Sequence, residues 1–508
     1  MSFELLLEGL TDIPDIPDLS DVADVPDIAD VEAPIDRSFC FDAGLKDSAD
    51  PKAVDITQSR PDTVTESRSA GELKKVFSLF IRAHKLQLIL IAVGLIMVVV
   101  YQILIHSGDA ARSVYFYVIR PLHSALASLN DHTSLCVGEV IIAAAIIALI
   151  VYALLRLVDK IYPFRRMMIR FSQWFVLFPI RYKVKQKRNP IAELTGLHKM
   201  KRTQVIWSTC SALLTVIMLV SLVYGGFCML WGFYYAAPGV SEIFGFDTDG
   251  VEHDDLVAVD RAFVNLANEY SALTARGEDG SDTAAVYSDA RMEEWIEHAD
   301  AGTFVFSDSS FAHSIALYDA VSLRYPGLSD KPHIPKKVHF SRIVSMLDFT
   351  GFFFPFTAEA CINMDSPDSM RPATIAHELA HQRGIASEDE ANFVGILASL
   401  EDGDPDYVYS ASLMALIHLQ NALYESGDID TWQEIKDSYS PLVAADLREN
   451  NEYWSKYRKN PVNKVSTNTY DAFLKSYDQP LGRETYGACV DYLVCYFSIV
   501  ENCDIFID

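Results

Sequence analysis

Long apolar stretches dominate the first half of this chain of 508 residues. Three of them, at about 86–105, 137–155 and 205–231, reach the roughly 20 residues that a helix needs to cross a bilayer. The third stretch carries aromatic residues at both ends, which is typical of helices that end at the two membrane surfaces. The pattern therefore predicts three transmembrane helices within residues 73–235, with the lipid bilayer as a partner.

The second half of the chain has shorter apolar patterns, mostly with the period of helices. Helical periodicity occurs at 256–273, 311–324, 410–424 and 470–499. Strand-like runs occur at 337–345 and 351–363. The apolar piece at 490–500 is too short to be a fourth span. Residues 236–508 are therefore expected to form one soluble, mostly α domain with a small sheet.

The N-terminal segment has a different composition from the rest of the chain. Residues 1–72 repeat Asp, Pro and β-branched residues, as in Asp-Ile-Pro-Asp-Ile-Pro-Asp, and show no basic and apolar pattern of a signal peptide. Clustered Asp side chains repel one another and Pro breaks helices, so we expect a disordered acidic tail. Such a tail would be available to recruit a cytoplasmic partner.

Charge predicts the orientation of the three spans. The chain has 42 Lys and Arg against 69 Asp and Glu, but basic residues gather at 158–203, between the second and third spans. Because basic loops stay in the cytoplasm, this loop and the tail are expected there, and three spans then put residues 236–508 outside the cytoplasm. Topology thus explains the basic cluster, and nucleic acid is not an expected partner of this acidic chain.

The eight cysteines do not form a CxxC pair, so neither a cysteine zinc knuckle nor a thioredoxin-like redox pair is predicted. Cys489 and Cys495 are candidates to pair with each other, with Cys503 or with Cys361. Buried free thiols are the simpler interpretation.

Candidate chemistry is concentrated in the pentapeptide His377-Glu378-Leu379-Ala380-His381. On a helix, two imidazoles four residues apart lie on one face and can bind one Zn²⁺ ion. Glu378 is offset from them and is placed to act as a general base. The small and apolar residues within and before the motif favour a buried active-site helix over a solvated one.

A hydrolytic zinc site needs a third protein ligand and one open position. Ser387 and Glu390 have the spacing of a capping box, which would give Glu390 a structural role at the start of a helix. Glu388 is therefore the expected third ligand, and Asn392, one turn later, is expected to orient a ligating His. Glu390 or Asp389 remains the alternative ligand, because neighbouring carboxylates in a short turn can exchange places.

Two further residues are candidates for contacts with a substrate. The strand at 351–363 could be an edge strand that pairs with an extended peptide, with Glu359 facing the cleft, or a plain core strand. Tyr409 is a candidate to stabilise an oxyanion, with a packed aromatic as the alternative.

Residues 351–360, 374–386 and 388–393 resemble the bacterial membrane family named domain of unknown function 3810. The resemblance implies a zincin-like, proteolytic ectodomain and brings no known substrate. More distantly, Glu388-x-x-Ala391-Asn392 is similar to the Glu-x-x-Ala-Asp ligand segment of gluzincins, with Asn in place of Asp.

Two functions remain open from the sequence. The first is hydrolysis of peptide bonds in a peptide or protein outside the cytoplasm, with zinc on His377, His381 and Glu388 and with Glu378 as the base. The second is a non-catalytic membrane sensor or scaffold, in which the zinc site is structural. A fourth protein ligand on the metal would favour the second.

Overall fold

The structure, a computed structural model, describes residues 75–158, 197–246, 248, 251–277, 302–458, 464, 466 and 486–500. The acidic tail expected at 1–72, most of the basic loop expected at 158–203 and the first part of the helix expected at 470–499 lie outside the described residues.

The described residues form two units. The smaller unit holds residues 75–85 and 197–210, in which Phe80 packs edge-on against Trp207 with 5.0 Å between ring centroids. The larger unit holds the other described residues and contains every side chain discussed below.

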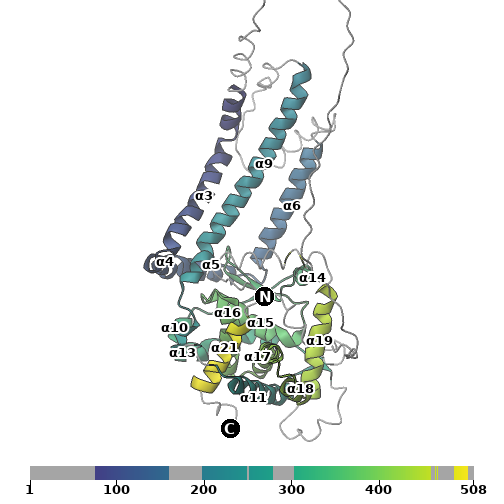
Figure 1. Ribbon diagram of the computed structural model, residues 1–508. Helices are drawn as coiled ribbons and strands as arrows, with labels where there is room; N and C mark the ends of the chain where they lie inside the picture. Colours follow the sequence, from purple (N-terminus) through teal and green to yellow (C-terminus); the bar gives the residue numbers. More distant parts are fainter. Residues whose placement is uncertain are drawn as a thin grey trace, which may run out of the picture. The chain divides into compact units, whose positions relative to one another are not determined.

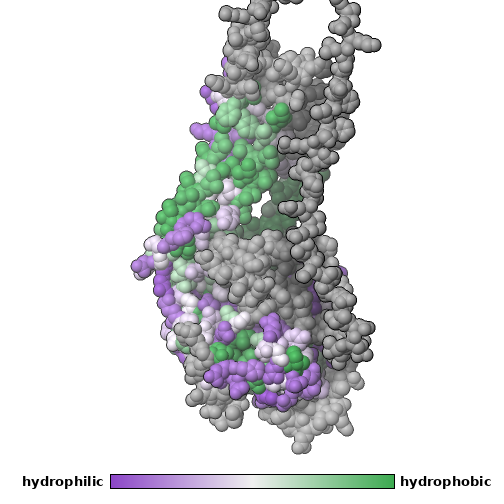
Figure 2. All heavy atoms as spheres, in the orientation of Figure 1, coloured by the Kyte–Doolittle hydropathy of each residue, from purple (hydrophilic) through white to green (hydrophobic). Residues whose placement is uncertain are grey.

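Among the described residues, three helices contain segments long and apolar enough to cross a membrane. These helices are α3 (Lys85–Ile105), α6 (Val137–Val158) and α9 (Leu197–Leu230). Large apolar side chains such as Leu95 and Ile147 are exposed on them, which suits a lipid environment. Figure 2 shows hydrophobic residues gathered over α3 and α9, and hydrophilic residues along the lower margin of the helical domain. The expected three apolar helices of spanning length are therefore confirmed.

The segment between the first two apolar helices folds against the helical domain. It consists of α4 (Gly108–Val114), η1 (Tyr115–Ile119) and α5 (Arg120–Asn130). The side chain of Asn130 donates to the carbonyl oxygen of Thr357 (2.7 Å), and Lys336 donates to the carbonyl oxygen of Asn130 (3.0 Å). This segment, for which the sequence indicated no structure, therefore ties the apolar helices to the sheet.

The main sheet has three short strands in the order β3-β5-β4. They are β3 (Lys336–Lys337), β4 (Gly351–Phe354) and β5 (Glu359–Ile362). β4 and β5 form an antiparallel hairpin in which Phe353 lies opposite Ala360, whereas β3 runs parallel to β5. β4 is therefore an edge strand in this sheet. A second sheet pairs β1 (Arg276–Gly277) with β2 (Thr303–Phe304).

The prediction of a strand at 337–345 is mostly wrong. After β3 the chain turns and forms the helix α14 (Ser341–Met346). Glu139 of α6 accepts hydrogen bonds from the backbone N–H groups of His339 (2.9 Å) and Phe340 (2.5 Å). This contact with a residue 200 positions away fixes the turn, and local periodicity does not encode it.

The remaining elements are helical, which confirms the expected mostly α class with a small sheet (Figure 1). They are η2 (Gly232–Ala236), α10 (Val240–Phe244), α11 (His253–Ser271), α12 (Asp308–His313), α13 (Asp319–Arg324), η4 (Pro326–Leu328), η5 (Asp368–Met370), α15 (Arg371–Gln382), α16 (Glu388–Asp402), α17 (Pro405–Glu425), α18 (Ile429–Asp437), α19 (Pro441–Arg458), α21 (Tyr486–Val494) and η7 (Cys495–Val500). The single helix expected at 311–324 is divided into α12 and α13. α17 packs against α11, α15, α16 and α21 and is buried along most of its length, so it forms the centre of the core.

Asp260 is a buried carboxyl group in this core. Its Oδ2 accepts a hydrogen bond from Nε2 of Gln420 (2.5 Å), and burial raises its pKa to about 7. Because the folded-state pKa exceeds the unfolded value of about 3.9, the stabilisation from protonated Asp260 is complete below about pH 4 and is lost as the pH rises through about 7.

We therefore expect Asp260 to contribute a fall in stability of roughly 2–4 kcal/mol between about pH 4 and pH 8, so the fall in Asp260→Asn should be smaller than that of the wild type by about this amount. Chemical unfolding of the protein in detergent, followed by tryptophan fluorescence at several pH values, measures the effect. An equally steep fall in the Asn variant would contradict this assignment.

Candidate metal centre

The helix α15 holds the two histidines of the HExxH motif inside the protein. Residues Pro372–Gln382 are all buried, and Pro372 lies in the first turn, where its missing N–H costs no helical hydrogen bond. His377 and His381 lie one turn apart with 4.7 Å between ring centroids. The helix ends before Gly384, whose φ of +105° is a conformation that glycine adopts without strain.

The turn that follows α15 determines which ring nitrogen of His381 carries a hydrogen atom. Nδ1 of His381 donates to the carbonyl oxygen of Ile385 (2.7 Å), so Nε2 carries the lone pair when the ring is neutral. Burial on its own would lower the pKa of His381, but the neighbouring Glu388 carboxylate outweighs burial and raises it. Burial lowers the pKa of His377.

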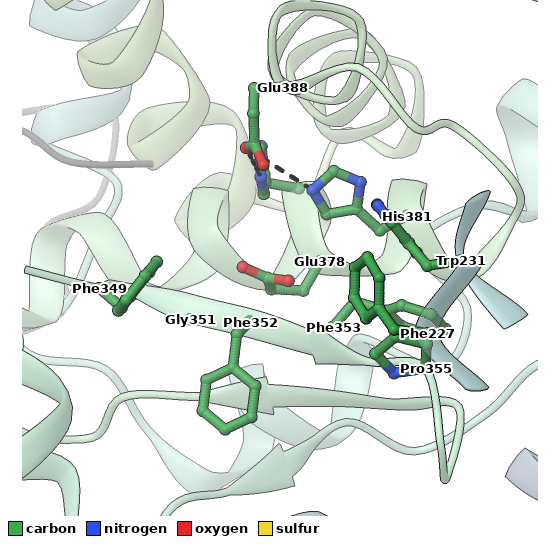
Figure 3. Close-up of a pocket in the computed structure, with 11 residues that line it drawn as sticks. Phe227, Trp231, Phe349, Gly351, Phe352, Phe353, Pro355, Glu378, His381 and Glu388 are labelled. Carbon is green, nitrogen blue, oxygen red and sulfur yellow. Dashed lines mark ion pairs between the residues drawn. The ribbon is translucent and has the colours of Figure 1, made fainter. Parts of the chain in front are cut away.

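Glu388 brings a carboxylate to both imidazoles. Its Oε2 lies 3.1 Å from Nε2 of His377 and 3.7 Å from Nε2 of His381 (Figure 3). Glu388 is the first residue of α16, which packs closely on α15 because Gly395 has no side chain. A Cβ at Gly395 would lie 2.9 Å from the backbone nitrogen of His377. These three side chains form a group with the composition and spacing of a metal site.

The capping box expected at the start of α16 is not formed. Ser387 is the N-cap residue, but its side chain makes no capping hydrogen bond. The carboxylate of Glu390 instead accepts hydrogen bonds from the backbone N–H of Val240 (3.0 Å) and from the hydroxyl of Tyr492 (3.5 Å). Glu390 therefore has a structural role, as expected, but it holds α10 and α21 rather than the first turn of α16.

Glu378 lies between the group of three ligands and the edge strand β4 (Figure 3). Its side chain is buried, and burial raises the pKa of its carboxyl group to about 7. The strand approaches closely at Gly351, where an added Cβ would lie 2.8 Å from Oε1 of Glu378. The carboxylate therefore lies beside both the ligand group and the backbone of the edge strand β4.

The four polar side chains open into a cavity of about 260 Å³ whose other walls are apolar. The lining residues are Phe227, Trp231, Phe349, Gly351, Phe352, Phe353, Pro355, His377, Glu378, His381 and Glu388. The Trp231 ring packs edge-on against His381, with 5.5 Å between centroids. The sequence had indicated a strand at 351–363 that could border a cleft, but nothing in it showed that Phe227 and Trp231, at the end of the third apolar segment, reach the same cavity.

The other candidate residues lie apart from this cavity. Glu359 is buried and accepts hydrogen bonds from the backbone N–H groups of Val137 (3.0 Å) and Gly138 (2.7 Å), so it caps the start of α6. Tyr409 is buried and donates to Asp446 (2.5 Å). Asn392 is buried in α16 one turn beyond Glu388, and its role in orienting a histidine stays a prediction.

Comparison with known proteins identifies one family. The family described as "Protein of unknown function (DUF3810)" matches residues 199–494, which is more than half of the chain. The match covers the third apolar helix, both histidines and Glu388, whereas α3 and α6 lie outside it. Neither a curated protein nor a solved structure matches the chain.

Proposed function

Because this chain belongs to the DUF3810 family, whose function is unknown, we propose its function from its own residues. It is a membrane-anchored, zinc-dependent metallopeptidase that hydrolyses peptide bonds outside the cytoplasm. The observation that carries this proposal is the convergence of both Nε2 atoms, from His377 and His381, on one oxygen of Glu388 beside the buried carboxyl group of Glu378.

The donor set fits zinc. Two imidazole nitrogens and one carboxylate are the ligands of many hydrolytic zinc sites, which keep a fourth position open, whereas structural zinc sites have four protein ligands. Among the described residues, the group contains three such ligands, and it borders a cavity. His377, His381 and Glu388 would hold the ion, and the hydrogen bond from His381 to Ile385 favours the tautomer that binding requires.

When bound, zinc polarises the scissile carbonyl group and lowers the pKa of water. The protein's own contribution is a proton acceptor and an orienting surface. The Glu378 carboxylate can take up a proton and deliver it to the leaving amine. Most of the cavity wall is apolar, which lowers the local dielectric constant and strengthens electrostatic interactions beside it.

A polypeptide substrate is favoured by the sheet edge beside Glu378. β4 pairs with β5 on one side, and in the described sheet its other edge has no partner strand. An extended peptide can add to such an edge through backbone hydrogen bonds, which places its peptide bonds along the strand. Gly351 of β4 would bring that peptide within reach of Glu378.

Location outside the cytoplasm is proposed from the distribution of charge. Basic residues cluster at 158–203, between the second and third apolar helices, which favours a cytoplasmic position for that loop. Three crossings then place the helical domain on the opposite side.

The test uses the full-length protein purified in detergent and a set of internally quenched peptides. We expect hydrolysis that a zinc chelator abolishes and that added Zn²⁺ restores. Zinc-loaded, folded protein that hydrolyses no peptide would contradict the peptidase proposal and favour the non-catalytic sensor.

A further inference from the structure

We propose that the substrates are membrane-anchored polypeptides, cleaved close to the bilayer surface, and that the cavity takes a bulky apolar side chain next to the scissile bond. This inference names a substrate class for the proposed peptidase and so rests on that function. Two observations carry it: the composition of the cavity walls and the position of the cavity at the end of the third apolar helix.

The composition of the cavity walls favours an apolar substrate side chain. Outside the metal ligands and Glu378, the lining is aromatic or aliphatic except for Gly351. A charged substrate side chain would lose its hydration there without gaining a partner, whereas an apolar side chain is stabilised by burial. The cavity of about 260 Å³ is below the roughly 300–1,000 Å³ of pockets for whole small ligands, which favours one or two side chains of a longer chain.

The cavity is built partly from an apolar helix. Phe227 belongs to α9, and Trp231 follows its last residue, within the segment Thr209–Phe244 that is long and apolar enough to cross a membrane. Trp231 stacks on Tyr234 with 5.0 Å between centroids. Both rings are buried in the protein, directly after the last residue of α9. The end of a spanning helix lies at the level of the lipid headgroups, so the cavity opens near the height of the bilayer surface.

The β4–β5 hairpin is fixed at the same height. Its Phe354 ring contacts α6 at Gly138, where an added Cβ would lie 2.6 Å from the ring. Phe356 in the turn lies against Gly226 of α9, where an added Cβ would be 3.1 Å away. The strand edge that would align a substrate is thus held between the ends of two apolar helices. A peptide that emerges from the bilayer reaches this edge within a few residues.

Binding is tested first, independently of turnover. The Glu378→Gln protein is reconstituted in phosphatidylcholine vesicles with a peptide that carries a transmembrane anchor and a photoreactive benzophenone side chain. We expect crosslinks to Phe227 or Phe353 when the linker between anchor and benzophenone is about three residues, and at least a tenfold lower yield when the linker is about thirty polar residues. Equal yields, or crosslinks away from the cavity, would overturn the proposal.

Turnover then tests side-chain preference in the active protein. We expect an anchored peptide with Phe near the scissile bond to be cleaved at least tenfold faster than the same peptide with Asp. Phe227→Ala should reduce this ratio, whereas Phe340→Ala, which removes an exposed ring outside the cavity, should leave it unchanged. Zinc-dependent cleavage without a preference for Phe or for an anchored peptide would overturn the proposed substrate class but not the peptidase activity. Crosslinking in the cavity without cleavage of any peptide would overturn the peptidase activity but not the binding of anchored polypeptides.

An independent observation concerns two cysteines, and from it we infer that Cys136 and Cys361 form a disulfide. Their Sγ atoms lie 3.1 Å apart, and both residues are buried. A disulfide bond is about 2.0 Å long, so a shift of about 1 Å brings the two atoms to bonding distance. Disulfides form outside the cytoplasm, where we propose that this domain lies.

The bond would join the start of an apolar helix to the sheet. Cys136 precedes the first residue of α6, and Cys361 lies in β5, the strand that pairs with β4. Glu359 already holds the two elements together through its hydrogen bonds to Val137 and Gly138. Glu359, Cys136 and Cys361 also form a group that could hold a metal ion, but Glu359 additionally accepts a hydrogen bond from Thr357 (2.7 Å), so its oxygens are already engaged.

The reaction needs a disulfide oxidant, such as the oxidised form of a thiol–disulfide oxidoreductase. The thiolate of one cysteine attacks a sulfur atom of that disulfide and releases one thiol of the oxidant. The other cysteine then attacks the mixed disulfide and releases the second thiol. The protein loses two hydrogen atoms, and the oxidant gains them. Because both sulfur atoms are buried in the fold, the exchange takes place before β5 packs against α6.

Mass spectrometry tests the bond. Full-length protein from membranes is alkylated under denaturing conditions without reductant, digested and compared with a reduced sample. We expect a peptide pair joined through Cys136 and Cys361, with Cys228 alkylated as an internal control. Reduction should lower the Tm of the wild type by several degrees and leave that of the Cys136→Ala/Cys361→Ala variant unchanged. Alkylation of both cysteines without reduction, or bound zinc that Cys136→Ala removes, would overturn the inference.

Discussion

Replacing Glu378 by Gln is expected to lower kcat/KM for peptide hydrolysis by about 10²- to 10⁴-fold while leaving zinc in place. Gln has nearly the same shape as Glu but cannot accept the proton. Glu378 is not one of the three converging ligands, so the metal content should stay that of the wild type. The measurement combines initial rates on a quenched peptide with zinc analysis of the same samples.

The matched control is Glu242→Gln, a carboxylate on the surface of α10 that does not line the cavity. It should retain the wild-type rate. If Glu378→Gln also retained that rate, the carboxyl group beside the ligands would not be the base, and the proposed mechanism would be wrong.

Replacing Asp446 by Ala is expected to destabilise the helical domain by about 3–5 kcal/mol. Its Oδ2 accepts hydrogen bonds from Arg276 (2.5 Å) and Tyr409 (2.5 Å), and its Oδ1 accepts one from the backbone N–H of Phe304 (3.1 Å). The Arg276 side chain is fully buried, so the substitution leaves a cation in the core without its carboxylate partner. Chemical unfolding in detergent gives the change in free energy.

An exposed ion pair provides the comparison. Arg261 and Glu434 lie 3.2 Å apart, and their side chains are 45% and 66% exposed. Because water and salt screen such a pair, Glu434→Ala should change the free energy of unfolding by less than about 1 kcal/mol. Equal effects of the two substitutions would contradict the role of Asp446 in the core.

The part of the site that local sequence encodes was predictable. The spacing of His377 and His381 follows from the period of a helix, and Glu388 follows from its place at the start of the next one. The three apolar helices were predictable because apolar runs of that length are rare in the helices of soluble proteins. The argument that led to Glu388 was partly wrong, because it assumed that Glu390 caps α16. Glu390 instead accepts a hydrogen bond from Val240.

The parts formed by distant residues were not predictable. The cavity wall at Phe227 and Trp231 is about 150 positions from His377, and no periodicity links them. No local pattern links Cys136 to Cys361 either, since they are 225 positions apart. Nor does a local pattern link Glu139 to His339 and Phe340, whose hydrogen bonds to Glu139 precede a helix where a strand was expected. Tyr409 and Glu359 are polar residues whose partners in the fold differ from the substrate contacts considered for them.

Zinc content of the purified, full-length protein tests the central claim most directly. After equilibration with Zn²⁺ and removal of excess metal, the wild type and Glu378→Gln should each retain about one zinc per chain. His377→Ala and His381→Ala should retain much less, with circular dichroism reporting whether each variant is folded. Folded wild-type protein that retains no zinc, or histidine variants that retain as much as the wild type, would contradict the proposed metal centre.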